Sequence, residues 1–322
     1  MSPCAIVTGV RGQDGHYLSG WLLGRGYRVV GVTRDAAASG VPAGVEAVAL
    51  DMTDAAAVEA LVARVRPDEI YNLAARASSA TLDEDPVLTL GVNGIAPVRW
   101  LEAIRRVCPS VRFCQASSSE VFGWAAESPQ SETTPFRPRN AYGAAKQYAQ
   151  TMVVVYRQRF GLHAGSAMLF NHESPRRGPE FVTQKVCRAA AAAALGQGGQ
   201  VVLGDLEGRR DWGYAGDYVR ALWLMLQQDQ PDDYVIASGR THSVRELCEL
   251  AYGHVGLDYR DFVRIDPQFV RAPETVELRG DPARARRVLG WEPQTGFAAM
   301  VCGMVDAARA AVSADISQGE LS

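Results

Sequence analysis

The first half of the chain alternates short, continuous apolar runs with stretches in which apolar residues recur at helical spacing. Continuous apolar runs are typical of strands that are buried on both faces of a parallel sheet. Strands that alternate with helices imply right-handed crossovers, with helices covering both faces of the sheet. The predicted strands are 5–8, 27–32, 45–50, 69–73, 111–116 and 164–170, and the predicted helices are 16–24, 55–66 and 141–160.

The pattern changes after residue 170, where polar and proline-bearing segments replace the regular alternation. Alanine is the best helix former, so the alanine-rich run in this half is interpreted as a plain helix. The predicted elements are helices at 185–195 and 211–226, a strand at 234–237 that returns to the sheet, shorter elements to about 311, and a flexible polar tail at 312–322.

Together these elements predict an α/β fold, a doubly wound parallel sheet with a smaller, mixed α/β C-terminal domain. A length of 322 residues suits one large domain or two unequal ones. We expect the larger, dinucleotide-binding domain to comprise 1–170 and about 211–240. The smaller domain then comprises 171–210 and 241–311.

Composition excludes several classes of protein. Apolar residues make up 47% of the chain and charged residues 21%, which supports a substantial core and excludes wholesale disorder. The net charge of −3 argues against a nucleic-acid or polybasic membrane surface. The six cysteines form no CxxC pair and no zinc-like cluster, so no metal site is predicted. With no secretory leader and no long uninterrupted apolar run, a cytoplasmic protein with reduced thiols is expected.

A glycine-rich loop follows the first predicted strand and opens the first predicted helix. Gly9, Gly12 and Gly15 recur at spacings of three, which lets the backbone turn tightly and approach a pyrophosphate. The unpaired amides at the start of the helix would bind that anion. The loop and its context therefore predict a dinucleotide site.

The ends of the next three strands bear on the choice of cofactor. Thr33 stands where an acidic residue would bind the ribose hydroxyls of NAD, and Arg34 beside it can accept the 2′-phosphate of NADP. Asp35 follows, so NADP is favoured and NAD stays possible. Asp51 and Met52 are expected to hold the adenine, with small residues near the nicotinamide ribose at Leu73, Ala74 and Ala75.

Four residues form a candidate catalytic group. Tyr142 and Lys146 lie one helical turn apart on the same face, and a nearby cation favours the phenolate that acts as a base. Ser118 and Glu120 follow the strand at 111–116, at the edge of the sheet where α/β sites form. Hydride transfer needs the tyrosine but no additional carboxylate. Oxidation of a sugar at C4 acidifies the neighbouring C5 proton, and a carboxylate such as Glu120 could remove that proton.

The loop at 8–15, the Ser118/Glu120 pair and the Tyr142/Lys146 pair resemble the extended short-chain dehydrogenases. The stretches 115–123, 134–146, 169–178 and 208–213 are similar specifically to the GDP-mannose 4,6-dehydratase family, over essentially the whole chain. The resemblance implies a Rossmann-type fold and a redox-neutral conversion of GDP-mannose to its 4-keto-6-deoxy product. The smaller domain would then bind the nucleotide sugar.

The resemblance also implies roles for individual residues. Tyr142 would take the C4 hydroxyl proton, Glu120 the C5 proton, and Ser118 would assist departure of the C6 hydroxyl. The implied cofactor contacts are Gly9, Gly12, Gln13, Asp14, Asp51, Met52, Lys146, His172 and Arg177, and the implied substrate contacts are Asn171, Lys185, Arg210, Arg271 and Glu274.

The chain departs from the family pattern at four places. The family has threonine at Ser118, a second arginine after Arg34, Gln-Ser at Arg76-Ala77, and Arg-Pro-x-Glu around Arg271. The loop after Arg34 is about a dozen residues shorter, which leaves both NADP and the family's tetramer open. A homodimer through the helix of Tyr142 and Lys146 is expected.

Two rival functions remain at this point. One is a related nucleotide-sugar 4-ketoreductase or epimerase, which would need no base at C5. The other is a catalytically silent binding homologue, which the joint presence of all four catalytic residues disfavours. The chain's only two lysines, Lys146 and Lys185, both fall in the proposed site, whereas the other 31 basic residues are arginines.

Overall fold

The computed structural model describes residues 2–37, 39–77, 85–269 and 276–319. Its centre is a seven-stranded sheet in the order β10-β6-β5-β4-β1-β2-β3, in which every pair is parallel. The α/β fold and the doubly wound parallel sheet are therefore confirmed. The strands are β1 (Cys4–Thr8), β2 (Arg28–Thr33), β3 (Glu46–Ala49), β4 (Glu69–Asn72), β5 (Arg112–Ala116), β6 (Ala164–Leu169) and β10 (Tyr234–Ile236).

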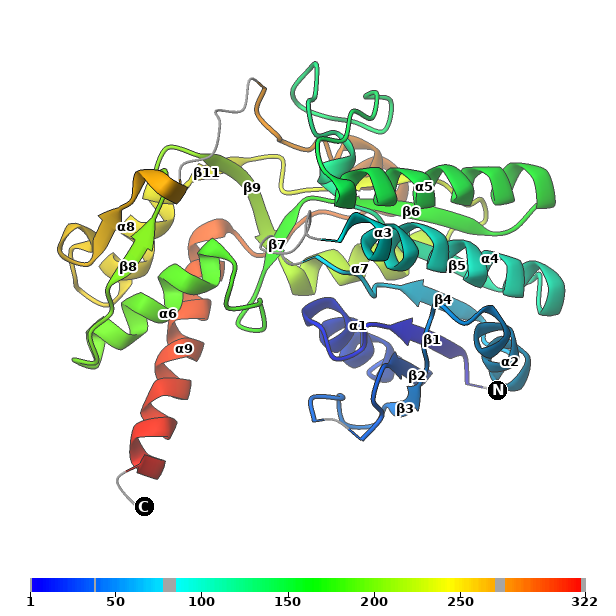
Figure 1. Cartoon of the computed structure of the whole chain (residues 1–322), viewed down its shortest axis with the longest axis horizontal. Helices are drawn as coiled ribbons and strands as arrows, with labels where there is room; N and C mark the ends of the chain where they lie inside the picture. The colour runs from blue at the N-terminus through cyan, green and yellow to red at the C-terminus, as the bar shows by residue number, and fades with distance from the viewer. Residues whose placement is uncertain (1, 38, 78–84, 270–275, 320–322) are drawn as a thin grey trace.

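Helices cover both faces of this sheet (Figure 1). Successive residues of β1 point to opposite faces, so Ala5 and Val7 pack in one cluster while Ile6 packs in another. The first cluster contains α1 (Gln13–Leu23) and α7 (Ala215–Leu226), and the second contains α2 (Ala55–Val65), α4 (Ala96–Val107) and α5 (Ala141–Phe160). Burial on both faces explains why the strands are continuous apolar runs.

A separate hydrophobic core, called the second core below, lies outside the seven-stranded sheet. It packs α6 (Val182–Ala194), α8 (Val244–His254) and the first part of α9 (Phe297–Gly319) against small strands. These strands form two small sheets: β11 (Thr241–Ser243), β9 (Arg209–Tyr214) and β7 (Asn171–Glu173) in one, β12 (Val263–Ile265) and β8 (Val201–Leu203) in the other. The parallel β7–β9 pair places Asn171 opposite Trp212.

Two expectations from the sequence need correction, and one helical region was not predicted. The helix expected at 211–226 begins at Ala215, because residues 209–214 pair on both sides as β9. The region 86–107, for which the sequence analysis assigns no element, forms α3 (Pro86–Leu90), a π-helical turn (Gly91–Ile95) and α4. The tail expected from 312 is helical to Gly319, because α9 meets no proline or glycine after Gly303 until its last residue.

Helix α9 also has unusual hydropathy. Its window Phe297–Ala314 has a mean hydropathy of 1.4, enough by length and composition alone to cross a membrane. Met300, Val301, Met304 and Val305 are buried in the second core, and 28% of this window is buried altogether. The far end of the helix extends away from the body of the molecule (Figure 1).

Candidate active site

The glycine loop lies between β1 and α1 and is shaped by close contacts. Gly9 has φ +67°, and a Cβ there would lie 2.9 Å from the Cα of Ala74. A Cβ on Gly15 would lie 2.4 Å from the Gly9 carbonyl oxygen. Gly12 caps α1 without any side-chain hydrogen bond, so the amides of the first turn face the loop. This narrow backbone cradle at a helix N-terminus fits a dinucleotide pyrophosphate.

Thr8 connects this loop to the end of β4. Its hydroxyl accepts hydrogen bonds from the amides of Leu73 and Ala74, both at 3.0 Å, and donates to Asn72 at 2.8 Å. The small residues expected near the nicotinamide ribose therefore lie directly against the glycine loop. The ends of β1 and β4 thus lie side by side at the candidate cofactor site.

The residues at the ends of β2 and β3 are more exposed. Arg34 follows Thr33, the last residue of β2, and its side chain is exposed. Asp35 uses Oδ1 to accept the Ala37 amide at 2.9 Å, a local turn of the backbone. Asp51 is also exposed, and hydrogen bonds from the Thr53 amide and hydroxyl lower its pKa.

A polar cluster joins α1 to β7 and the segment that follows it. The amide of Gln13 donates to the His172 carbonyl at 2.9 Å, and its oxygen accepts from the Ser174 hydroxyl at 2.7 Å. His172 Nε2 lies 2.9 Å from an Asp14 carboxylate oxygen, and Nδ1 lies 2.7 Å from the Phe170 carbonyl oxygen. Both ring nitrogens thus face acceptors, which is the geometry of an imidazolium.

The charges of this cluster explain its pKa shifts. Burial alone would lower the pKa of His172, but the Asp14 carboxylate overcomes that effect and raises it. Burial likewise favours a higher pKa for Asp14, and the charge and hydrogen bond of His172 turn the shift downward. The ring of His172 also stacks on Tyr218, with centroids 4.8 Å apart. The expected cofactor contacts Gln13, Asp14 and His172 are therefore brought together.

Arg177 lies beside the same cluster. Its Nε is 3.1 Å from the buried Glu173 carboxylate, and its guanidinium carbon is 3.5 Å from the centroid of Phe181. Glu173 also accepts from the hydroxyl of Thr183 at 2.5 Å. Glu173 and Ser174, which fix this segment, are not predicted by the sequence pattern, since short polar residues in a proline-bearing stretch give no periodic signal.

The four candidate catalytic residues converge on the N-terminus of α5. Lys146 is only 1% exposed, and its Nζ donates to the Ala116 carbonyl at 2.7 Å. That nitrogen lies 5.7 Å from the centroid of the Tyr142 ring. Within the described residues, the Ala116 carbonyl is the one hydrogen-bond acceptor of this ammonium, so its other donors suit the hydroxyls of a cofactor ribose.

The pKa of Tyr142 runs against the expectation from the sequence. Burial raises it to about 12, and the nearby carboxylates of Glu120 and Asp14 add to the rise. A hydrogen bond with Ser118 and the charge of Arg177 oppose that rise. Burial also lowers the pKa of Lys146 to about 8, an effect that Asp14 partly offsets. The pKa of Tyr142 rises because desolvation outweighs the hydrogen bond with Ser118 and the charge of Arg177, while the Lys146 ammonium is directed toward the Ala116 carbonyl.

Glu120 is held by two residues that the sequence analysis did not single out. Asn140 donates its side-chain amide to Oε2 at 2.8 Å, and Arg139 approaches both carboxylate oxygens at 3.3 and 3.4 Å. The side chain of Asn140 also accepts the Gly143 amide at 2.7 Å and caps α5. An Asn immediately before a helical run is an N-cap signal, so this residue could have been found.

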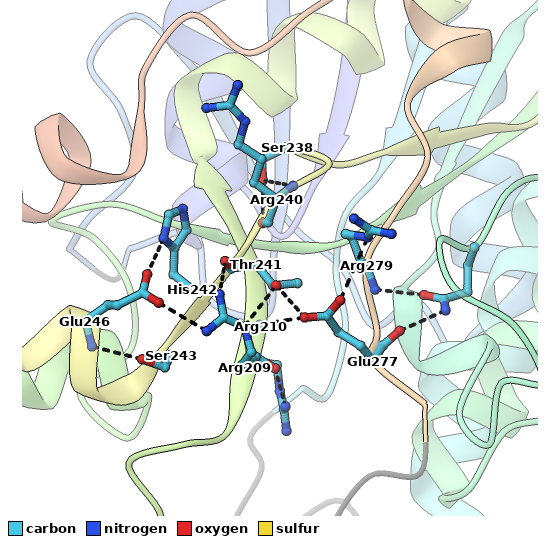
Figure 2. Close-up of polar contacts among 11 residues, drawn as sticks. Arg209, Arg210, Ser238, Arg240, Thr241, His242, Ser243, Glu246, Glu277 and Arg279 are labelled. Atoms are coloured by element: carbon cyan, nitrogen blue, oxygen red, sulfur yellow. Dashed lines mark hydrogen bonds and ion pairs between the residues drawn. The ribbon is translucent and has the colours of Figure 1, made fainter.

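The expected substrate residues are distributed over the second core. Asn171 lies on β7, Arg210 on β9, and the exposed Lys185 in the first half of α6. Figure 2 shows Arg210 within a group of charged side chains from β9, β11, α8 and the segment 277–279. Arg271 and Glu274 lie outside the described residues. Within the described residues no three His, Cys, Asp or Glu side chains gather as a metal site.

Two of the arginines in Figure 2, Arg209 and Arg279, form ion pairs with carboxylates. Arg209 lies 3.1 Å from Glu246 and 3.5 Å from Glu277, and Arg279 lies 3.8 Å from Glu277. Glu277 also accepts from the hydroxyl of Thr241. This network ties β9 and β11 to the segment at 277–279, so Arg209 is neutralised by carboxylates in its surroundings.

Comparisons with known proteins show which family the chain resembles. The family model described as GDP-mannose 4,6 dehydratase matches residues 6–304. The chain is 43% identical to GDP-mannose 4,6 dehydratase 2 of Arabidopsis thaliana, over 94% of this chain and 86% of that protein. It is 39% identical to the Homo sapiens GDP-mannose 4,6 dehydratase, over 94% and 90%. A solved UDP-glucose 4-epimerase from Thermus thermophilus, in complex with NAD, superposes with a TM-score of 0.83 at 29% identity, covering 96% of this chain and 99% of that one.

Proposed function

The chain belongs to the GDP-mannose 4,6-dehydratase family, and we propose that it converts GDP-mannose to GDP-4-keto-6-deoxymannose with no net change in its cofactor. The observation that carries this function is the placement of Glu120 beside Tyr142 at the N-terminus of α5. A nucleotide-sugar 4-ketoreductase or epimerase needs the tyrosine and the lysine but no base at C5. The joint presence of Ser118, Glu120, Tyr142 and Lys146 also argues against a silent homologue.

The proposed roles follow from the proton chemistry. Tyr142 takes the C4 hydroxyl proton. The ammonium of Lys146, 5.7 Å from the centroid of the Tyr142 ring, stabilises the resulting phenolate. The chemistry that a bound nicotinamide supplies is storage of a hydride, taken from C4 and given back at C6. Glu120 removes the C5 proton made acidic by the new C4 ketone, while Ser118 donates a hydrogen bond to the departing C6 hydroxyl. Of the two protons taken up, one leaves in water and the other returns to C5.

The raised pKa of Tyr142 has a consequence for this mechanism. In the cofactor-free protein the phenol is protonated at neutral pH. It becomes a competent base only when further positive charge is brought near it, and this links deprotonation of the sugar to a loaded site. A phenol that stays protonated at rest cannot take the C4 hydroxyl proton until that positive charge is present.

The cofactor is a nicotinamide dinucleotide, and we propose NADP rather than NAD. Arg34 is exposed at the end of β2, where a guanidinium can bind a 2′-phosphate bidentately. Asp35 already accepts the Ala37 amide, which supports a turn-forming role for it. The residues proposed to bind the cofactor are Gly9, Gly12, Gln13, Asp14, Arg34, Asp51, Met52, Leu73, Ala74, Ala75, Lys146, His172 and Arg177.

The nucleotide sugar is proposed to bind over the second core, through Asn171, Lys185 and Arg210. Arg271 and Glu274 remain candidates from the sequence. Accordingly, we propose residues 1–170 and about 211–240 as the cofactor-binding domain, and 171–210 and 241–311 as the sugar-binding domain. We also propose a cytoplasmic enzyme, in keeping with the six free cysteines.

The test is to incubate the purified protein and NADP with GDP-mannose or with UDP-, CDP- and dTDP-hexoses. Formation of a 4-keto-6-deoxy product is followed by its ultraviolet absorbance in alkali. We expect product from GDP-mannose, and we expect Glu120→Gln to lose product formation and solvent deuterium incorporation at C5 while still binding GDP-mannose. Normal turnover by Glu120→Gln would contradict the mechanism, and turnover of only another sugar would contradict the substrate.

A further inference from the structure

A single side chain, Asn140, connects the two proton-transfer groups of the site. Its nitrogen Nδ2 donates to Oε2 of Glu120 at 2.8 Å. Its oxygen Oδ1 accepts the backbone amide of Gly143, the residue after Tyr142, at 2.7 Å. Both polar atoms of the amide are thus used, one on the carboxylate and one on the first turn of the helix that carries the phenol.

The backbone around this link leaves little freedom for either group. A Cβ on Gly143 would lie 2.4 Å from the Glu120 carbonyl oxygen, so the start of α5 packs directly on the 3-10 turn Ser119–Val121. Asn140 itself is extended, with φ −147° and ψ 166°, as an N-cap requires. Any rotation of its amide would break one hydrogen bond or both.

We propose that Asn140 is a positioning residue that fixes the orientation of the Glu120 carboxylate relative to Tyr142; this rests on the proposed function of the site. Ser, Asp and Asn are all good N-caps, because each offers an oxygen to a helix amide. Asn alone among them also carries an amide donor for a carboxylate. The residue type at this position is thus explained by Glu120 and not by the helix alone.

Arg139 cannot supply the same constraint. Its guanidinium contacts both oxygens of Glu120, but at 3.3 and 3.4 Å, longer than the Asn140 hydrogen bond. Its positive charge favours the carboxylate from a distance, whereas the amide of Asn140 fixes one oxygen. Oε1, which Arg139 Nη2 approaches at 3.3 Å, is then the oxygen that would take the C5 proton of a bound sugar.

The test uses variants that separate the two hydrogen bonds. Asn140→Asp keeps an oxygen to cap α5, loses the donor to Glu120 and adds a like charge beside it. Asn140→Ser keeps the capping oxygen and replaces the amide donor with the hydroxyl of a shorter side chain, which weakens the hydrogen bond to Glu120. We expect both to keep the wild-type Tm and the KM for GDP-mannose within about twofold, and to lower kcat roughly ten- to hundredfold. Asn140→Ala loses the cap as well and should show a lower Tm.

Two further readouts distinguish positioning from a purely structural role. Without the amide donor, the protonated and inactive form of Glu120 is favoured, so the acidic limb of the kcat/KM profile should move to higher pH, further in Asn140→Asp than in Asn140→Ser. C4 oxidation should still occur while C5 deprotonation slows, so reduced nicotinamide should accumulate transiently in single-turnover absorbance traces.

Unchanged pH profiles in both variants, with no accumulation of reduced nicotinamide, would overturn the role of Asn140 and leave the proposed function intact. Failure of the wild-type protein to act on GDP-mannose would instead contradict the proposed function. A loss of activity that follows Tm alone, seen in Asn140→Ala but not in the two capping variants, would also overturn the proposal.

Discussion

Burial of the Lys146 ammonium destabilises the folded protein, although the proposed mechanism needs this charge in the site. Burial lowers its pKa to about 8, and in the unfolded chain it is about 10.4. Below pH 8 the lysine is charged in both states, and the cost of burying that charge, about 3 kcal/mol, is fully present. The cost falls as the pH rises from about 8 to about 10, because the folded protein loses the proton first.

We therefore predict that Lys146→Met stabilises the cofactor-free protein by about 1–3 kcal/mol near neutral pH while abolishing turnover. The gain should shrink toward pH 10. Urea unfolding of the wild type and the variant at several pH values measures this. The matched control is Lys185→Met, since Lys185 is the only other lysine and is exposed. A pH-independent effect, or a strongly destabilised Lys146→Met, would contradict the prediction.

Arg34 is the residue on which the choice of cofactor depends. If it binds the 2′-phosphate, Arg34→Ala should weaken NADP binding roughly tenfold or more and leave NAD binding unchanged. Isothermal titration with both cofactors measures the difference, with the exposed Arg64→Ala on α2 as the control. Equal loss for both cofactors, or co-purification of the native protein with NAD alone, would rule out NADP selection by Arg34.

At the scale of elements, the ion pair between Asp14 and His172 joins α1 to β7 and so couples the glycine loop to the segment that precedes α6. The pKa of His172 is raised, so its contribution to stability is complete below about pH 6.5 and is lost as the pH rises through the folded value. The pKa of Asp14 is lowered, so its contribution is present above about pH 4 and is lost on acidification.

Asp14→Asn should accordingly reduce the free energy of unfolding most between about pH 4 and 6.5, by on the order of 1–3 kcal/mol, and less at higher pH. Chemical denaturation across this pH range measures the effect. The exposed pair of His254 and Asp306, at 2.8 Å, provides the control, because Asp306→Asn should have a much smaller effect. An effect of Asp14→Asn that does not change with pH would exclude the ion pair as its cause.

The elements were predictable to very different degrees. β1, β2, β4 and β5 are within a residue or so of their expected bounds, because burial on both faces imposes continuous apolar runs. β7 and β11 are three residues long and polar, so only their pairing with β9 makes them strands. The same pairing converts the start of the expected helix at 211–226 into a strand.

At the scale of the whole molecule, we propose that the chain forms the homodimer expected from the sequence, through an exposed apolar surface. Val87 of α3 is 81% exposed, and Leu88 and Leu90 of the same helix, Ile95 of the π-helical turn and Tyr148 of α5 are each about 40% exposed. These residues lie on α3, the π-helical turn and α5, which contact one another. An exposed apolar surface on neighbouring helices is typical of a protein–protein interface.

The double variant Val87→Glu/Tyr148→Glu should convert a dimer to a monomer at micromolar concentration, as measured by sedimentation velocity. Ile265→Glu is the control, because Ile265 is 51% exposed on β12, outside these helices. A dimer that persists in the double variant would place the interface elsewhere, and a monomeric wild type would exclude it.

Local sequence by itself determined the sheet and the glycine loop, and it predicted Glu120, Tyr142 and Lys146 as candidate catalytic residues. Each of these depends on periodicity or on spacing within about ten residues, which the chain displays directly. Tertiary structure alone decided that Asn140 bonds Glu120, that Asp14 pairs with His172 across 158 positions, and that burial raises the pKa of Tyr142. These depend on which distant segments meet and on how much water they exclude, and neither quantity is encoded in local pattern.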